Sequence, residues 1–319
     1  MRNTSWDVII VGGGSAGLSA ALMLGRARRR VLVLDGGAPR NRFAPHMHAV
    51  LGHDGRSPLD LLAAGRAELD RYGVVIEGAD VASARRSADA RSFDVTIASG
   101  ELHVARRLLV ATGMRDVLPD VPGLAEQWGT GAVVCPYCDG WEVRDRRIAI
   151  LATSAMSTHQ AQLLRQWSAE VSYFVNGTEL SGDAHAALVA RGIAIETREV
   201  ARVLAGEEGR LSGIRLADCS EVPVDAIFLH PTPVPNDAVL RELGAATVEQ
   251  MGMDWVAVDE NGRTSVPGVW AAGNVVSARA SVPVASAAGN VAGAMINADL
   301  IEEEVEAAVS SPALRRLRA

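Results

Sequence analysis

Two of the three cysteines of the chain, Cys135 and Cys138, are separated by two residues in the stretch Val134–Trp141. Such a pair can form and break a disulfide, or it can supply two thiolates to a metal ion. A structural zinc site needs two further ligands, and no second Cys-x-x-Cys or histidine pair stands at a suitable spacing. We therefore interpret Cys135 and Cys138 as a redox-active pair, and we assign no role to the isolated Cys219.

Asp139 directly follows the cysteine pair. A carboxyl group in this position could protonate a leaving thiolate or activate an attacking thiol, although it could equally cap the turn that follows. Tyr137 and Trp141 flank the pair and could either line an apolar pocket or serve as packing residues.

A phosphate-binding pattern opens the chain. The apolar strand expected at residues 6–11 runs into Gly12-x-Gly14-x-x-Gly17, a helix is expected over 18–28, and a second strand over 30–34 ends at Asp35. The glycines permit a tight turn, close approach of a pyrophosphate and packing of helix on strand, while the acid can bind a ribose hydroxyl. The helix N-terminus then faces the phosphates, so this unit predicts a bound dinucleotide.

Two later strand ends could contribute to the same site. One strand ends in Ala111-Thr112-Gly113, and another in Gly273-Asn274 far downstream. The last helix, expected over 285–306, carries small residues early, which favours close packing against backbone or cofactor. We expect its acidic end to be a solvated face.

Three histidines, His46, His48 and His53, occur in the loop expected over residues 36–58. Because no cysteine or paired carboxylate accompanies them, we favour a polar loop over a metal site. His48 is a candidate for a contact with the edge of a flavin or for proton handling, since histidine titrates near neutral pH. An ordinary surface histidine remains the alternative.

A second βαβ rhythm follows, with strands expected over 147–151 and 170–175 and a helix over 158–166. The turn at 152–157 contains no glycine, and no arginine cluster follows the second strand to hold a 2′-phosphate. We therefore expect this unit to have lost its dinucleotide. A divergent loop that still binds NADPH through other contacts is the alternative.

The composition and charge of the chain indicate its fold class and disfavour several kinds of partner. The chain has 319 residues with 31 glycines and 4% aromatic residues, which is typical of an α/β protein with two domains. The net charge of −7 disfavours nucleic acid or an anionic membrane as a partner. No secretory signal and no uninterrupted apolar run of about 18 residues are visible. Together with few cysteines, these features lead us to expect a cytoplasmic protein.

These motifs together resemble the low-molecular-weight thioredoxin reductase family over nearly the whole chain. The resemblance implies two Rossmann-like domains in an α/β fold, the second inserted into the first. It implies FAD bound by a discontinuous domain of residues 1–116 and 241–319, and an inserted domain of residues 117–240 that carries the disulfide. It also implies a homodimer. The residues expected to contact FAD are Gly12, Gly14, Ser15, Ala16, Gly17, Asp35, Gly36, Arg40, His48, Ala111, Thr112, Gly113, Gly273, Asn274 and Val282.

The chain departs from that family at the glycine-free turn of residues 152–157, and Asn274 stands where an aspartate is usual. Loss of the NADPH motif with retention of the cysteine pair resembles the dithiol oxidases of gliotoxin and holomycin biosynthesis. The resemblance implies that Cys135 faces a small-molecule dithiol, that Cys138 faces the flavin, and that oxygen accepts the electrons as hydrogen peroxide. Two alternatives stay open. One is a thioredoxin or disulfide reductase that uses ferredoxin or weakly bound NADPH, and the other is a non-catalytic flavin-binding redox sensor.

Overall fold

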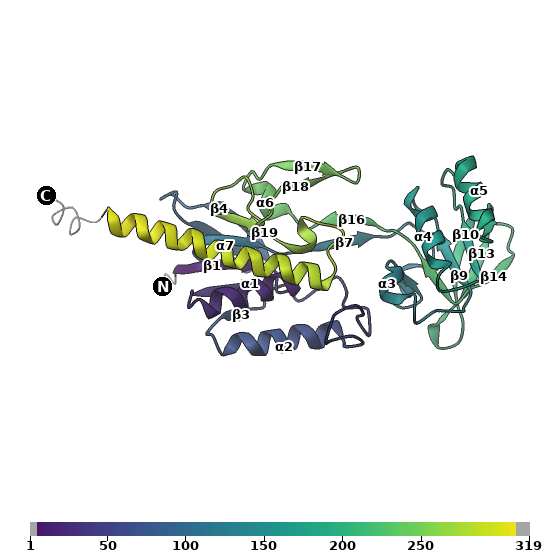
Figure 1. Ribbon diagram of the computed structural model, residues 1–319, viewed down its shortest axis with the longest axis horizontal. Coiled ribbons are helices and arrows are strands. Elements are labelled where there is room, and N and C mark those ends of the chain that lie inside the picture. Colours follow the sequence, from purple (N-terminus) through teal and green to yellow (C-terminus); the bar gives the residue numbers. More distant parts are fainter. Residues whose placement is uncertain (1–4, 311–319) are drawn as a thin grey trace. The chain divides into compact units, whose positions relative to one another are not determined.

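The computed structural model describes residues 5–310 and resolves them into two compact units, which we treat separately (Figure 1). Unit 1 comprises residues 1–40, 59–115 and 235–319, and unit 2 comprises 41–58 and 116–234. The chain is therefore a mixed α/β protein in which one unit is built from three separate segments. The segment 41–58 belongs to the same unit as the cysteine pair.

Unit 1 is built around a seven-stranded sheet. Its strand order is β3-β2-β1-β6-β5-β4, and β19 pairs with β6 as well. The strands on the β1 side and β19 are parallel, whereas β4, β5 and β6 form an antiparallel meander. The elements of this unit are β1 (Ser5–Val11), α1 (Ser15–Arg26), β2 (Val31–Leu34), α2 (Pro58–Asp70), β3 (Val75–Glu77), β4 (Val81–Arg86), β5 (Phe93–Ile97), β6 (Leu102–Val110), α6 (Ala238–Glu242), β17 (Thr247–Gln250), β18 (Met253–Val256), β19 (Val269–Ala271), a 3₁₀ turn (Gly273–Val275) and α7 (Val282–Val309).

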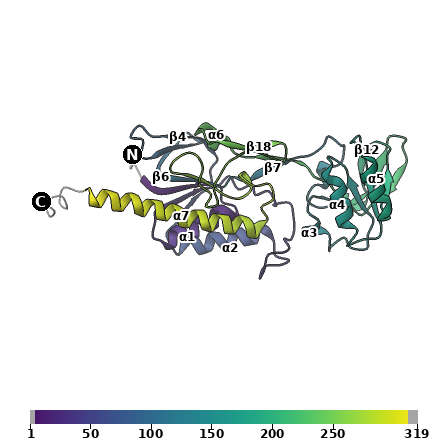
Figure 2. The same ribbon diagram turned by 45° about the horizontal axis from the view of Figure 1, so that its top comes forward.

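Helices α1 and α7 lie side by side on one face of this sheet, as both ribbon views show (Figures 1 and 2). Gly289 and Gly293 of α7 make the close approach possible, because a Cβ atom at either position would collide with the backbone of Ala16 or Ala20 in α1. The early small residues of the last helix thus pack against another helix. The opposite face of the sheet is covered by α6 and the β17–β18 hairpin, whose buried residues join its second core.

The acidic end of α7 is exposed, as expected, and two of its glutamates also form ion pairs. Arg107 of β6 contacts Asp299 and Glu303, and Arg106 contacts Glu303 and Glu304. Among the described helices, α7 alone is long and apolar enough to cross a membrane, a property that it shares with core helices of soluble proteins.

Unit 2 contains a five-stranded parallel sheet of order β11-β10-β9-β15-β8 and a three-stranded antiparallel sheet of order β12-β13-β14. Two apolar cores cover the two faces of the parallel sheet. Its elements are a 3₁₀ turn (Ala125–Gln127), β8 (Ala132–Val133), α3 (Pro136–Asp139), β9 (Ile148–Leu151), α4 (Met156–Leu164), β10 (Val171–Phe174), α5 (Gly182–Ala190), β11 (Ala194–Glu196), β12 (Val200–Ala205), a 3₁₀ turn (Glu207–Gly209), β13 (Leu211–Leu216), β14 (Glu221–Pro223) and β15 (Ala226–Phe228). Strands β7 (Met114–Val117) and β16 (Thr232–Pro235) form a two-stranded ribbon where the chain passes from one unit to the other.

Candidate functional site

The glycine turn after β1 has the geometry that a pyrophosphate requires. Gly12 has a φ of 105°, and a Cβ there would collide with the carbonyl of Ala111. A Cβ at Gly14 would meet nothing within 4 Å, so the space above it is open. Gly14 is the N-cap of α1, and no side chain caps this helix. The first backbone N–H groups of α1 therefore remain available to a phosphate, with Ser15 and Ala16 in its first turn.

Asp35 directly follows the strand β2 and lies at the wall of a cavity of about 650 Å³. Its carboxylate accepts a hydrogen bond from Arg66 at 2.6 Å and another from the backbone N–H of Gly37 at 3.1 Å. Burial alone would raise the pKa of Asp35, but the bonds from Arg66, Gly37 and Gly13 hold it below its ordinary value. An ionised carboxylate has further acceptor sites, so Asp35 can also bind a ribose hydroxyl. Gly36 and Gly37 line the same cavity.

The other expected cofactor contacts in unit 1 lie at the ends of its central strands. Ala111, Thr112 and Gly113 follow β6, and the hydroxyl of Thr112 donates to the carbonyl of Asn236 at 2.6 Å. The side chain of Asn236 donates back to the carbonyl of Thr112 at 3.0 Å. This reciprocal pair fixes the turn, and Asn236 was not foreseen because it lies 124 residues away in the sequence.

Gly273 and Asn274 follow β19 directly. Gly273 has a φ of 80°, and a Cβ there would lie 3.1 Å from that of Ala16. The side-chain amide of Asn274 donates to the carbonyls of Ser277 and Ala280 at 2.9 and 3.0 Å. Asn274 therefore folds the loop that leads to α7, while its side-chain oxygen can still accept a hydrogen bond from a ligand. Val282 is the first residue of α7, and Arg40 ends the first segment of unit 1.

These features meet the requirements of a dinucleotide flavin. The open space at Gly14, the uncapped helix N-terminus and the ionised Asp35 suit the pyrophosphate and the ribose respectively. Of the expected contact residues, only His48 lies in the other unit.

Cys135 and Cys138 of unit 2 form a disulfide with their Cα atoms 5.2 Å apart. Cys135 is the N-cap of the four-residue helix α3, and its carbonyl accepts from the N–H groups of Cys138 and Asp139. Gly140 ends this helix, and a Cβ there would collide with the carbonyl of Pro136 and press on the ring of Trp167. The helix is thus held tightly against Trp167. Asp139 is the last residue of this helix, and no hydrogen bond contributes to the shift of its pKa.

The aromatic residues beside the disulfide are largely exposed. Tyr137 is 69% exposed and meets Trp167 edge to face, with ring centroids 5.9 Å apart. Trp141 is 64% exposed, and the guanidinium of Arg144 lies over its ring at 4.2 Å. Neither residue is a buried packing residue.

Asp139 lies within a group of ionisable side chains next to the disulfide. Burial and, to a smaller extent, the negative charge of Glu142 raise its pKa, His48 opposes them, and the net pKa is about 6. His48 itself lies 3.4 Å from Glu142 and 3.5 Å from Asp54. A carboxyl group with a pKa near 6 can both give and take a proton close to neutral pH. Glu142 and Asp54 were not predicted from the sequence. The only available signal was their short spacing, Glu142 from Asp139 and Asp54 from His48.

The three histidines of the 41–58 segment do not converge on one point. His46 contacts the carbonyl of Gly55, and His53 contacts Arg56. Elsewhere, one ligand atom each from Glu77, Glu101 and His103 lies within 4.8 Å of the others. This cluster in unit 1 was not among the sequence candidates, and exposed acidic groups commonly gather without an ion. Cys219 is exposed and unpaired.

The glycine-free turn between β9 and α4 is closed by its own side chains. The backbone N–H of Thr153 donates to the hydroxyl of the fully buried Ser157 at 3.1 Å. The hydroxyl of Thr153 donates to the carbonyl of His230 at 2.7 Å. In a nucleotide-binding turn, such backbone N–H groups face phosphate oxygens, and here Ser157 takes the place of a ligand.

The chain matches the family model described as pyridine nucleotide-disulphide oxidoreductase over residues 6–289. It is 35% identical to the "Thioredoxin reductase tcpT" of Claviceps purpurea (strain 20.1), over 84% of this chain and 86% of that protein. It is 32% identical to the "Thioredoxin reductase sirT" of Leptosphaeria maculans, with the same coverage.

Among solved structures, the chain superposes on the crystal structure of HlmI with a TM-score of 0.93 and 42% identity, covering 100% of this chain and 99% of that one. These similarities and the site geometry lead to one conclusion. The chain belongs to the pyridine nucleotide-disulphide oxidoreductase family, as a thioredoxin reductase-like flavoprotein that binds FAD and resembles the gliotoxin and holomycin enzymes.

Proposed function

We propose that this protein oxidises a small-molecule dithiol to an intramolecular disulfide and transfers the electrons through FAD to oxygen. The observation that carries the proposal is the turn at residues 152–157, where Ser157 binds the backbone N–H of Thr153. A turn closed in this way offers little to the phosphates of NADPH, whereas the Cys135–Cys138 disulfide and the flavin fingerprint are both intact. Electrons then enter from the thiol side.

The reaction consists of two thiol–disulfide exchanges. A substrate thiolate attacks the sulfur of Cys135, which breaks the Cys135–Cys138 bond and releases the thiolate of Cys138. The second substrate thiol, after losing its proton, attacks the substrate sulfur of the mixed disulfide. This step closes the cyclic product and releases Cys135, so the protein has gained two electrons as a dithiol. By the family resemblance, Cys135 is the sulfur that meets the substrate.

Asp139 supplies the proton transfers of these exchanges. With a pKa raised to about 6, its carboxyl can protonate the leaving thiolate and its carboxylate can accept a proton from the second substrate thiol. FAD, held by the turn at Gly12–Gly17 and by Asp35, would supply the acceptor for the electron pair of the reduced cysteines and the route to oxygen, with hydrogen peroxide as the product.

The test compares two electron donors. Under anaerobic conditions, we expect dithiothreitol to bleach the yellow holoprotein and NADPH to leave it unchanged. In air, dithiothreitol should drive oxygen uptake with one hydrogen peroxide formed per dithiol. Cys135→Ser and Cys138→Ser should abolish both signals, and Cys219→Ser, a replacement outside the disulfide, should keep them. Bleaching by NADPH would instead support a thioredoxin reductase, the name that the fungal relatives carry.

We also propose a homodimer, on the family resemblance alone. Light scattering of the purified holoprotein would give twice the mass of one 33.5 kDa chain, and a single-chain mass would contradict the proposal.

A further inference from the structure

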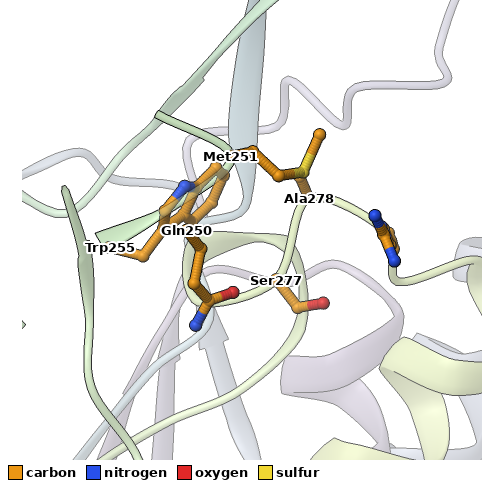
Figure 3. Close-up of a pocket in the computed structure, with 6 residues that line it drawn as sticks. Gln250, Met251, Trp255, Ser277 and Ala278 are labelled. Atoms are coloured by element: carbon orange, nitrogen blue, oxygen red, sulfur yellow. The ribbon is translucent and has the colours of Figure 1, made fainter. Parts of the chain in front are cut away.

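Unit 1 contains a second cavity, of about 240 Å³, between the β17–β18 hairpin and the loop before α7. Gln250 is the last residue of β17, Met251 lies in the hairpin turn, and Trp255 comes from β18. The other side is formed by Ser277, Ala278 and Arg279. In Figure 3 the polar ends of Gln250 and Ser277 lie on one side of the cavity, and the thioether of Met251 lies on the other.

The lining of this cavity is rich in hydrogen-bond donors that have no partner. The ring of Trp255, which is 1% exposed, lines the cavity, but its buried Nε1–H offers no surface to it and makes no hydrogen bond. Within residues 5–310, the side chains of Gln250 and Ser277 make no hydrogen bond, and Arg279 makes no ion pair. Gln250 and Arg279 are exposed, so a ligand in the cavity would take the place of water at their polar ends.

The acidic residues of the hairpin point away from the cavity. Val248 lies opposite Trp255 in the β17–β18 ladder, so Val248, Gln250 and Trp255 share one face. Glu249 and Asp254 pair with each other on the opposite face. The guanidinium of Arg279 is thus the one formal charge among the lining residues, and it favours an anion.

The cavity also adjoins the segment that is expected to hold the flavin. Asn274, one of the expected FAD contacts, donates its amide to the carbonyls of Ser277 and Ala280 and so folds the loop that forms one wall. A molecule in the cavity would therefore lie next to this part of the cofactor site. Met251, at the rim, keeps a φ of 55° that non-glycine residues rarely adopt, and it is 58% exposed. Its unbranched apolar side chain forms part of the lining.

We propose that this cavity binds the carboxylate of a small acidic substrate, with Arg279 as the anchor, Gln250 and Ser277 as donors and the ring of Trp255 as an apolar wall. The identity of the ligand as substrate rests on the proposed dithiol oxidase function. The binding preference for an anion rests only on the residues of the cavity.

The experiment uses two cyclic disulfides that differ only in charge, lipoate and its neutral amide lipoamide. The oxidised holoprotein cannot oxidise either compound, so calorimetric titration measures binding alone. We expect lipoate to bind about tenfold more tightly than lipoamide at low salt, and the preference to shrink as salt screens the exposed guanidinium. Arg279→Gln should abolish the preference without loss of bound flavin, whereas Arg71→Gln, on an exposed arginine of the same unit, should retain it.

Equal affinities for the two compounds, binding of neither, or a preference that survives Arg279→Gln would each overturn the proposal. The proposed function is read out separately, from oxygen uptake with the reduced forms. A protein that prefers lipoate but oxidises neither reduced compound would refute the oxidase and keep the anion site. Oxidation of both reduced compounds with equal KM values would support the oxidase and refute the anion site.

Discussion

The Nε2 atom of His48 lies 3.4 Å from the Oε1 atom of Glu142, and this contact links the 41–58 segment to the residues that follow the disulfide. Both side chains act on Asp139, in opposite directions. His48 and Glu142 therefore both adjust the pKa of Asp139, the proposed acid–base group. Replacing either residue tests this effect.

His48→Gln should raise the pKa of Asp139 above about 6, because it removes a positive charge that stabilises the carboxylate. Glu142→Gln should lower the same pKa, because it removes a repelling negative charge. Infrared difference spectra against pH would follow the protonated carboxyl band, which Asp139→Asn identifies by its loss. Shifts of the same sign in both variants would contradict the arrangement.

Asp139→Asn should slow turnover but stabilise the fold above pH 6. The folded protein holds the proton of Asp139 up to about pH 6, whereas the unfolded chain releases it near 3.8. As the pH rises from about 4 to 6, the wild-type protein therefore loses folding free energy, because the buried carboxyl must ionise in the folded state. At pH 8 the variant should gain up to about 3 kcal/mol in urea unfolding, and at pH 4 the gain should vanish. An equal effect at both pH values would argue against burial as the cause.

Gly14→Ala should fold normally and lose FAD. A Cβ at Gly14 meets no protein atom within 4 Å, so it would occupy only the space assigned to the pyrophosphate. We expect the flavin content after gel filtration to fall at least about tenfold, with the circular dichroism unchanged. Gly182→Ala is the matched control, because its Cβ also meets nothing and it begins α5 in the other unit. Full flavin retention by Gly14→Ala would remove this turn from the site.

Arg107→Ala should destabilise unit 1 by about 3 to 5 kcal/mol, since a mostly buried ion pair loses one partner. Arg107 is 11% exposed in its side chain and holds both Asp299 and Glu303 of α7. Arg202→Ala, on an exposed residue of β12, should change the free energy of unfolding by less than about 0.5 kcal/mol. Denaturant titration of both variants measures the difference, and similar values would show that the α7 contacts add little.

Local sequence motifs predicted much of the fold. They did not predict the exact bounds of the elements or the contacts between residues that are distant in the sequence. The α/β class and the glycine turn were predicted correctly, yet α1 begins at Ser15 rather than at residue 18, because Gly14 serves as its N-cap. The end of the strand was expected at Ala111-Thr112-Gly113, whereas β6 runs from Leu102 to Val110 and these three residues form the turn after it. The carboxylate partners of Arg106 and Arg107 lie nearly 200 residues away, and no local motif indicates them.

The charged residues that surround Asp139 could not be predicted either, because they are distant from one another in the sequence. Asp139 was named from its place beside Cys138, but its raised pKa depends on burial and on Glu142 and His48. His48 and Glu142 are 94 positions apart, and no spacing rule connects them. The donor-rich cavity at Trp255 and Arg279 is likewise made by two segments that are distant in the sequence.

The pairing of β6 with β19 determines the order in which parts of the chain can fold during synthesis. Leu108 pairs with Val269, so the central sheet of unit 1 waits for 161 residues that include nearly all of unit 2. At about 5 to 20 residues per second, the ribosome needs roughly 10 to 30 s to supply β19 after β6. The disulfide-bearing unit is therefore synthesised before the sheet of the flavin unit can close. Flavin loading becomes a late event, which follows release of α7 from the exit tunnel.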